Sequence, residues 1–111
     1  MVERSAQQLD AVYGALAHPV RRAMLEVLAD SPSRVTDLAA PFAMSFAAVS
    51  KHVRVLEGAG LVARTVRGRE HELALHPEPL ADAAAWLAHY RRFWHQRLDL
   101  LEARLLDRRR S

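Results

Sequence analysis

Residues 45–62 read SFAAVSKHVRVLEGAGLV, and their pattern predicts a helix with two unlike faces. Val49, Val53 and Leu56 stand at i, i+4 and i+7, which places them in one apolar stripe along a helix. The opposite side carries small, polar and basic residues, namely Ala47, Ala48, Ser50, Lys51 and Arg54. The stretch therefore predicts a helix that packs on a core by one face and presents the other face to a partner.

The predicted helix has chemical signals for both of its ends. Ser45 can cap the N-terminus, because its hydroxyl can accept a hydrogen bond from a first-turn amide that has no partner within the helix. Gly58 and Gly60 can adopt the left-handed conformations with which helices end. Small residues followed by serine, lysine and arginine allow close approach to a groove floor and hydrogen bonds to bases and phosphates. We interpret the helix as a DNA recognition helix; an ordinary amphipathic surface helix has the same apolar spacing.

Neighbouring segments place this helix in the order helix, turn, helix, hairpin. A short helix capped by Thr36 is expected before it, with residues 43–45 as the turn. After it, residues 61–67 and 69–75 alternate between apolar and polar side chains, which predicts two strands joined around Gly68. This order favours the recognition-helix interpretation over the surface-helix alternative.

The motif around the recognition helix resembles that of the ArsR (arsenic-resistance repressor) family of winged-helix regulators. The residues that carry the resemblance stand here as Ser50-Lys51-His52-Val53, Leu56 and Ala59-Gly60-Leu61-Val62, in the spacing of the family. The resemblance extends over most of the chain and implies a winged helix-turn-helix that binds double-stranded DNA. The helix residues expected to contribute to DNA binding are Ser45, Phe46, Ala47, Ala48, Ser50, Lys51, His52 and Arg54.

The hairpin that follows the recognition helix is the expected wing. Its tip, Arg67-Gly68-Arg69, could enter a narrow minor groove or bind phosphates, or it could be a solvated turn. Arg64 stands between apolar neighbours on the first strand. Because these basic residues follow a predicted recognition helix, we favour DNA contact and include Arg64, Arg67 and Arg69 in the predicted interface.

Two helices are expected before the helix-turn-helix. The first covers residues 5–16, with apolar residues at helical spacing: Leu9, Val12, Tyr13 and Leu16. The second begins at His18-Pro19, since proline is tolerated at the first helical position. Its expected buried residues are Val20, Met24, Leu25 and Leu28. Its expected exposed residues are Arg21, Arg22 and Glu26.

The residues from Leu80 onward predict one long helix, because they include no glycine or proline. Its apolar residues recur at steps of three and four, namely Leu87, Tyr90, Trp94, Leu98, Leu101 and Leu105. A helix this apolar has more surface to bury than one small domain can cover. The resemblance implies a dimer interface formed by the first and last helices, which adds Leu9, Val12 and Tyr13 to the expected interface. The alternative is a terminal helix packed wholly on its own subunit.

Composition limits the other classes of function. With 111 residues, of which 50% are hydrophobic, the chain is expected to form one domain over residues 1–111. The absence of cysteine excludes disulfides and thiolate metal sites. No apolar run approaches the roughly 20 residues that cross a bilayer, so we expect a soluble, cytoplasmic protein without a membrane partner. The formal net charge of +3, with arginines clustered locally, fits a DNA-binding dimer.

Six histidines raise the alternative of a metal-responsive repressor. The resemblance implies a cysteine site at the start of the third helix in metal-sensing members, where this chain has Arg34-Val35-Thr36. It implies a second site of carboxylate and imidazole ligands along the last helix of both subunits. There the chain offers Asp82 and His95, but Ala84 and Leu98 stand where two further ligands are needed. Two ligands cannot hold a transition metal selectively, so no metal and no other cofactor is expected.

Together these observations predict a mainly helical winged helix-turn-helix with a small β-hairpin, in the order α-α-α-α-β-β-α. Residues 33–75 are the expected DNA-binding core and wing, and residues 5–16 and 80–107 the expected dimerisation helices. The predicted function is a homodimeric transcriptional regulator, usually a repressor in this family, on a palindromic operator. A dimeric interaction module that has lost DNA binding is the remaining alternative, since no phosphate loop or nucleophile motif predicts an enzyme. The sequence identifies no small-molecule inducer.

Overall fold

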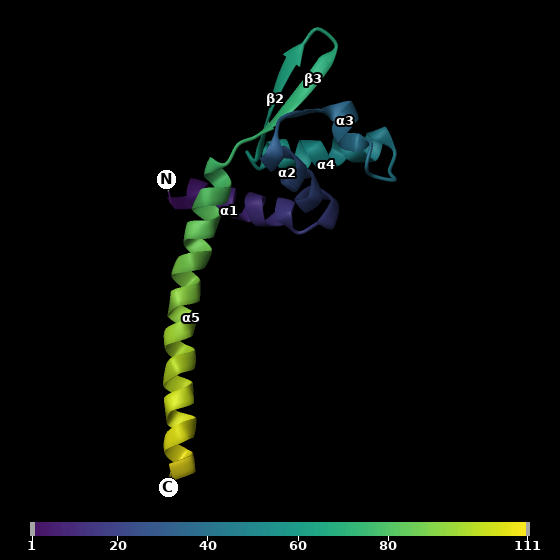
Figure 1. Ribbon diagram of the computed structural model, residues 1–111. Helices are drawn as coiled ribbons and strands as arrows, with labels where there is room; N and C mark the ends of the chain where they lie inside the picture. The colour runs from purple at the N-terminus through teal and green to yellow at the C-terminus, as the bar shows by residue number, and fades with distance from the viewer. Residues whose placement is uncertain (1, 111) are drawn as a thin grey trace.

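The computed structural model describes residues 2–110 and shows helices packed around a small sheet, with one long helix projecting away (Figure 1). The elements are α1 Val2–Leu16, α2 Pro19–Asp30, β1 Ser33–Arg34, α3 Val35–Ala39, α4 Phe46–Gly58, β2 Val62–Arg67, β3 Glu70–Leu75 and α5 Glu78–Arg110. The mainly helical fold with a hairpin confirms the predicted class. Within the described residues, the first strand is the one element that the predicted order lacks.

The ends of α2 and α4 follow from local chemistry. His18 caps α2 through its Nδ1, which accepts from the Val20 amide at 3.1 Å, and Pro19 occupies the first helical position. The predicted cap of α4 is confirmed, since Ser45 Oγ accepts from the Ala48 amide at 3.1 Å. After α4 the backbone turns left-handed at Gly60, with φ of 76°.

The prediction that Gly58 is also left-handed is wrong. It is the last residue of α4, and Gly60 and Gly68 are the glycines with positive φ in the described chain. Ala59 continues in right-handed geometry, so a single glycine is enough to redirect the chain toward β2.

The start of α3 also differs from the prediction. Arg34, not Thr36, holds the cap position of α3, and it makes no capping hydrogen bond through its side chain. The reason is that Ser33 and Arg34 form β1, which pairs antiparallel with Leu73 and Glu72 of β3. Thr36 is therefore already inside the helix. The helix ends at Ala39, so the turn before α4 covers residues 40–45 and is longer than predicted.

The three strands form an antiparallel sheet in the order β1-β3-β2, and β2 and β3 form the wing hairpin. The register pairs Arg67 with Glu70, which leaves Gly68 and Arg69 as a two-residue turn. Gly68 has φ of 64° and Arg69 has no positive φ, as in a turn with glycine at its first central position. The prediction that the second strand begins at Arg69 is therefore off by one residue: Arg69 lies in the turn, and β3 begins at Glu70.

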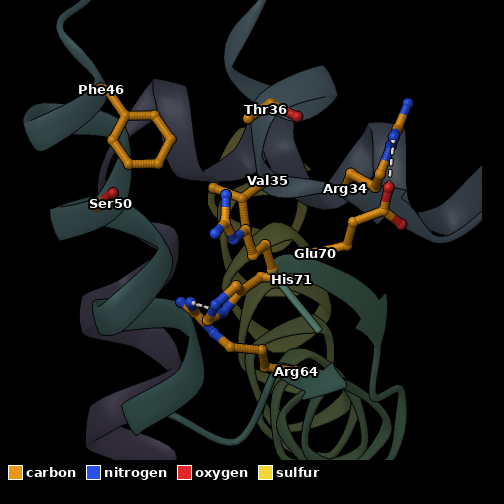
Figure 2. Close-up of a pocket in the computed structure, with 9 residues that line it drawn as sticks. Arg34, Val35, Thr36, Phe46, Ser50, Arg64, Glu70 and His71 are labelled. Carbon is orange, nitrogen blue, oxygen red and sulfur yellow. Dashed lines mark hydrogen bonds and ion pairs between the residues drawn. The ribbon is translucent and has the colours of Figure 1, made fainter. Parts of the chain in front are cut away.

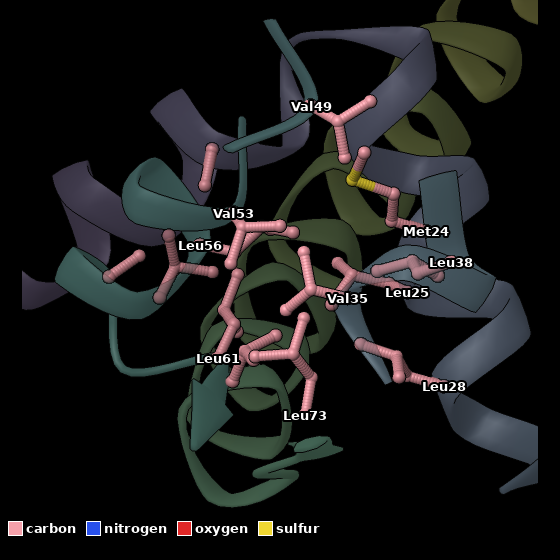
Figure 3. Close-up of a cluster of buried hydrophobic side chains, with 14 of the residues drawn as sticks. Met24, Leu25, Leu28, Val35, Leu38, Val49, Val53, Leu56, Leu61 and Leu73 are labelled. Carbon is pink, nitrogen blue, oxygen red and sulfur yellow. The ribbon is translucent and has the colours of Figure 1, made fainter. Parts of the chain in front are cut away.

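The core lies where α1, α2, α3 and α4 meet the sheet (Figure 3). The predicted apolar stripe of α4 is confirmed, because Val49, Val53 and Leu56 are each fully buried. Leu73 of β3 and Met24 of α2 are also fully buried. Burying side chains of this size stabilises the fold by about 1.5–3 kcal/mol each, so the stripe holds the recognition helix firmly to the rest of the domain.

Helix α5 extends far beyond this core (Figure 1). It has 33 residues, which corresponds to about 50 Å of helix. The radius of gyration is 19.6 Å, whereas a compact chain of this length has a value of about 13 Å. Figure 1 shows the C-terminal end of α5 and the wing at opposite ends of the molecule. Among residues 2–110 no helix combines the length and the apolar character needed to cross a membrane.

Candidate nucleic-acid interface

The side chains of α4 face three different surroundings besides the core. Because successive residues rotate by about 100° around a helix, Ala47, Lys51 and Arg54 share the side opposite the buried stripe, and all are exposed. Phe46 and Ser50 lie on the flank toward the wing, where they line a hollow together with wing residues. The outer face of α4, formed by Ala47, Lys51 and Arg54, thus contains fewer residues than predicted, and these residues are small or basic.

The other flank of α4 carries His52, and the prediction that this residue contributes to DNA binding is not supported by its position. The His52 ring is half-buried and lies 4.5 Å, centroid to centroid, from the ring of His18. Its Nδ1 lies 3.2 Å from Arg21 Nη1. Since a guanidinium can only donate, His52 Nδ1 must accept and is unprotonated in this arrangement. His52 therefore joins α4 to α2 rather than facing outward.

Arg21, predicted to be exposed, is half-buried and joins three helices. Besides the contact with His52, its Nε donates to the Ala15 carbonyl at 2.7 Å and its Nη2 donates to the Gly14 carbonyl at 3.1 Å. These carbonyls belong to the last turn of α1, where the helix dipole favours a positive charge. Arg21 is therefore a mechanical link between α1 and the recognition helix.

Acid should destabilise the protein through His52. Burial, reinforced by the charges of His18, Arg21 and Lys51, holds the pKa of His52 below its ordinary value of 6.5. The unfolded chain then binds more protons than the folded chain between these two pKa values. Neutral His52 contributes fully to the free energy of unfolding above about pH 6.5. This contribution is lost as the pH falls from the pKa of the unfolded chain through the lower pKa of the folded chain.

His52→Gln keeps an acceptor for Arg21 but cannot titrate, so its free energy of unfolding should fall less than that of the wild type between about pH 7.5 and pH 5. Urea unfolding at both values and at one protein concentration measures this difference. His89→Gln, on the exposed side of α5, is the matched control. Equal pH dependence in His52→Gln and the wild type would contradict the assignment.

Arg64 also lies in a different environment from the predicted DNA-facing one. Its Nη2 and Nε donate to the two carboxylate oxygens of Glu57 at 2.6 and 3.2 Å, and its Nη1 lies 3.0 Å from His71 Nδ1. The paired side chains of Arg64 and Glu57 are only 27% and 29% exposed. A two-point pair of this kind fixes orientation as well as distance. Arg64 thus braces the wing against the end of α4.

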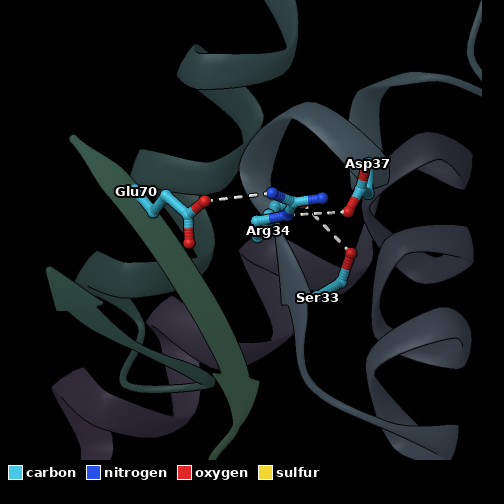
Figure 4. A network of polar contacts seen from close by, with 4 residues as sticks. All are labelled: Ser33, Arg34, Asp37 and Glu70. Carbon is cyan, nitrogen blue, oxygen red and sulfur yellow. Dashed lines mark hydrogen bonds and ion pairs between the residues drawn. The ribbon is translucent and has the colours of Figure 1, made fainter. Parts of the chain in front are cut away.

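The wing tip matches the predicted position of exposed cations. Arg67 and Arg69 are both exposed, on either side of Gly68. Next to them, Glu70 pairs with Arg34 at 3.1 Å, and Arg34 also pairs with Asp37 at 3.1 Å (Figure 4). Asp37 and Glu70 raise the pKa of Arg34 above its ordinary value. This exposed network ties the start of β3, at the tip end of the wing, to α3, and Arg67 and Arg69 are left as the cations at the tip.

Comparison with known proteins supports the predicted role as a DNA-binding transcriptional regulator. A helix-turn-helix domain family matches residues 16–65, from the end of α1 into β2. The HTH-type transcriptional regulator Rv2034 of Mycobacterium tuberculosis is 38% identical over 89 residues, which are 80% of each chain. The crystal structure of the ArsR family transcriptional regulator RHA00566 is 37% identical, with a TM-score of 0.77 over 81% of this chain and 93% of that one. The chain belongs to the ArsR family.

A further solved structure shares the fold of this ArsR-family chain. It is the homodimeric winged helix-turn-helix DNA-binding domain Mb0332 of Mycobacterium bovis, 24% identical, with a TM-score of 0.62 over 85% of this chain and 84% of that one. The family assignment makes the chain a transcriptional regulator with a helix-turn-helix DNA-binding domain, and not an enzyme.

The long α5 of this ArsR-family protein carries a wide exposed apolar face. Its exposed large residues are Trp86, Leu87, Tyr90, Phe93, Trp94, Leu98, Leu100, Leu101, Leu105 and Leu106, which are 44–63% exposed. The rings of Trp86 and Tyr90 stack at 5.4 Å, and Tyr90 meets Trp94 edge to face at 5.9 Å. Exposed apolar area on this scale is typical of surfaces that bind a protein, a membrane or a ligand.

One residue of α1 does not fit the predicted interface. Val12 is fully buried in the core of its own subunit, so it cannot present its side chain to a partner. Leu9 and Tyr13 are half-buried at its edge. Tyr13 donates its hydroxyl to the Ala83 carbonyl at 2.8 Å and meets Trp86 edge to face at 6.0 Å, which ties α1 to the start of α5.

The two potential metal ligands of α5 lie far apart. Within one subunit, Asp82 and His95 are separated by roughly 20 Å along the helix. Arg91 Nε lies 3.4 Å from His95 Nε2. Among the described residues, there is no group of three or more histidine, aspartate or glutamate side chains that could hold a metal ion.

Proposed function

We propose that this ArsR-family regulator is a homodimeric repressor that binds an inverted-repeat operator. The observation that carries the proposal is the outer face of α4, where Ala47, Lys51 and Arg54 are exposed directly opposite a fully buried stripe. Small side chains let a helix approach a groove floor, and the two cations can then reach base edges or phosphates.

The expected contacts divide between two elements. On α4, the capped N-terminus at Ser45, together with Lys51 and Arg54, enters the major groove, and Ser50 borders that contact from the wing side. On the wing, Arg67 and Arg69 contact phosphates or the minor groove. We assign Arg64 and His52 to positioning, because each is held by partners within the subunit.

The apolar face of α5 supports the dimer. A second copy is a suitable cover for a long helix whose rings and leucines are about half exposed. The Mycobacterium bovis domain with this fold is homodimeric. In a two-fold dimer the two recognition helices present the same residues in opposite directions, so the operator should be an inverted repeat with half-sites about 34 Å apart.

Footprinting on the promoter of the protein's own gene tests this proposal. We expect a protected region that contains an inverted repeat with half-sites centred one helical turn apart. A matched promoter fragment with one half-site scrambled should lose protection at low protein concentration. Addition of the protein to a transcription reaction on this promoter should lower transcript yield. Protection without sequence preference, or unchanged transcription, would contradict the repressor assignment.

A further inference from the structure

A hollow of about 320 Å³ lies between the start of α3, the recognition helix and the wing (Figure 2). Its walls come from the start of α3, from α4 and from both strands and the turn of the wing, and include Val35, Phe46, Ser50, Arg64, Arg69 and His71. Val35 is buried, whereas Phe46 is 58% exposed although it is a large aromatic residue. The size lies at the lower end of the range of small-molecule sites, about 300–1,000 Å³.

The polar groups of this hollow are mostly donors. Because Arg64 can only donate, His71 Nδ1 accepts from it, and the proton of neutral His71 is on Nε2. His71 Nε2 is therefore a donor. Within the described residues the side chains of Ser50 and Arg69 make no hydrogen bond or ion pair to the protein. A ligand that supplies acceptor oxygens would satisfy these groups, whereas a ligand rich in donors would not.

The charge of the walls also favours an anion. Three arginines line the hollow, at positions 34, 64 and 69, against the single carboxylate of Glu70. Asp37 and Glu57, which pair with Arg34 and Arg64, are not among the lining residues. Arg34 and Arg64 are already paired with carboxylates, so within the described residues Arg69 is the lining cation that an anion would find unpaired. A carboxylate in the hollow would be held by charge-assisted hydrogen bonds.

We propose that this hollow binds a small aromatic carboxylate. The ring of Phe46 and the side chain of Val35 supply an aromatic and aliphatic wall, and the donors described above supply the carboxylate site. Phe46 and Ser50 stand one helical turn apart on the flank of α4, so the occupant would contact the recognition helix without covering Lys51 or Arg54.

The location gives the ligand a regulatory role, which rests on the proposed DNA-binding function. The occupant would touch both elements that contact DNA, α4 through Ser50 and the wing through Arg69. It would compete with DNA phosphates for Arg69 and change the spacing between helix and wing. Ligand and operator should therefore weaken each other's binding by the same factor, which is the behaviour of an inducer.

Direct titration of the full chain with 2-naphthoate, without DNA, tests the site. Two-dimensional ¹H–¹⁵N NMR should show saturable shifts at millimolar ligand, centred on Val35, Phe46, Ser50 and His71. The isosteric but uncharged 2-naphthamide should bind at least about tenfold more weakly, because it lacks the carboxylate charge. No saturable shift, or shifts confined to α1 and α5, would overturn the proposal. Equal shifts of the same residues with inorganic phosphate would identify the hollow as a seat for the DNA backbone instead.

Variants separate the aromatic wall from general surface effects. Phe46→Ala should weaken 2-naphthoate binding about tenfold or more, and its exposed position makes a folded variant the expected outcome. Val66→Ala removes a similarly exposed apolar residue of the wing that does not line the hollow, and should leave ligand binding unchanged. Equal affinity of Phe46→Ala and Val66→Ala would contradict the assignment.

Operator binding in the presence of 2-naphthoate tests the regulatory part. Saturating ligand should raise the dissociation constant for the operator in the wild type and much less in Phe46→Ala. Unchanged operator affinity at saturating ligand would overturn the inducer role. Failure to bind any operator without ligand would instead contradict the proposed function, and the titration without DNA would still decide whether the hollow binds carboxylates.

Discussion

Changing Trp94 or Leu101 to aspartate is expected to convert the dimer into monomers and to remove specific operator binding. The two side chains are 48% and 53% exposed on the apolar face of α5. A two-fold interface contains each of them twice, and each buried side chain of this size contributes about 1.5–3 kcal/mol. The dimer dissociation constant should therefore rise roughly 10²- to 10⁴-fold, and more if the new charges are left unpaired.

Sedimentation equilibrium at micromolar concentration measures the first effect, and operator binding measures the second. Gln96→Asp places the same charge on the opposite side of the same helical turn and is the matched control, which should remain a dimer. A wild-type chain that is monomeric at micromolar concentration would refute the dimer. A dimeric Trp94→Asp together with a dimeric Leu101→Asp would show that a different face of the subunit forms the interface.

The parts of this fold that the sequence predicts correctly depend on local signals. The stripe of Val49, Val53 and Leu56 follows from helical spacing, and the Ser45 cap follows from its position before the first turn. Gly68 marks the wing turn because its positive φ is one that other residues rarely adopt. The cap of α3 was predicted wrongly, since a two-residue strand such as β1 is too short to show alternation.

The polar partners could not be predicted, because they depend on tertiary packing. Arg64 has a pattern that fits an exposed wing residue, yet it faces Glu57 across the junction of α4 and β2. Arg21 and His52 are 31 positions apart and meet only because α2 and α4 pack together. Periodicity gives the face of a residue on its own helix and does not identify the opposing helix. The hollow beside the wing, which residues of α3, α4 and the wing strands form together, was missed for the same reason.

DNA binding should divide into a sequence-reading part on α4 and a phosphate-holding part on the wing. Lys51 and Arg54 are exposed on the outer face of a helix that its core stripe fixes in place. If they contact base edges, Lys51→Ala or Arg54→Ala should cost about 1–3 kcal/mol on the operator and much less on scrambled DNA. These variants should therefore lose discrimination between the two DNAs.

Arg67→Ala and Arg69→Ala should behave differently, because phosphates are alike in every sequence. Each variant should weaken operator and scrambled DNA to a similar extent. Each should also flatten the salt dependence, by a slope of about one for every phosphate that a bound subunit no longer neutralises. Arg92→Ala, on the exposed polar side of α5, provides a control for the removal of one arginine charge away from the proposed interface.

The measurement is affinity for operator and scrambled DNA across a salt series, with each variant and the wild type. Arg64→Ala adds a third class: it removes the brace to Glu57, so it should weaken operator binding through misplacement of the wing, and Glu57→Ala should have the same effect. If Arg64 instead contacts a phosphate directly, Arg64→Ala should weaken operator binding and Glu57→Ala should not weaken it to the same extent. Should Lys51→Ala and Arg54→Ala keep wild-type discrimination, the outer face of α4 does not read the operator, and a dimeric interaction module becomes the better description of this chain.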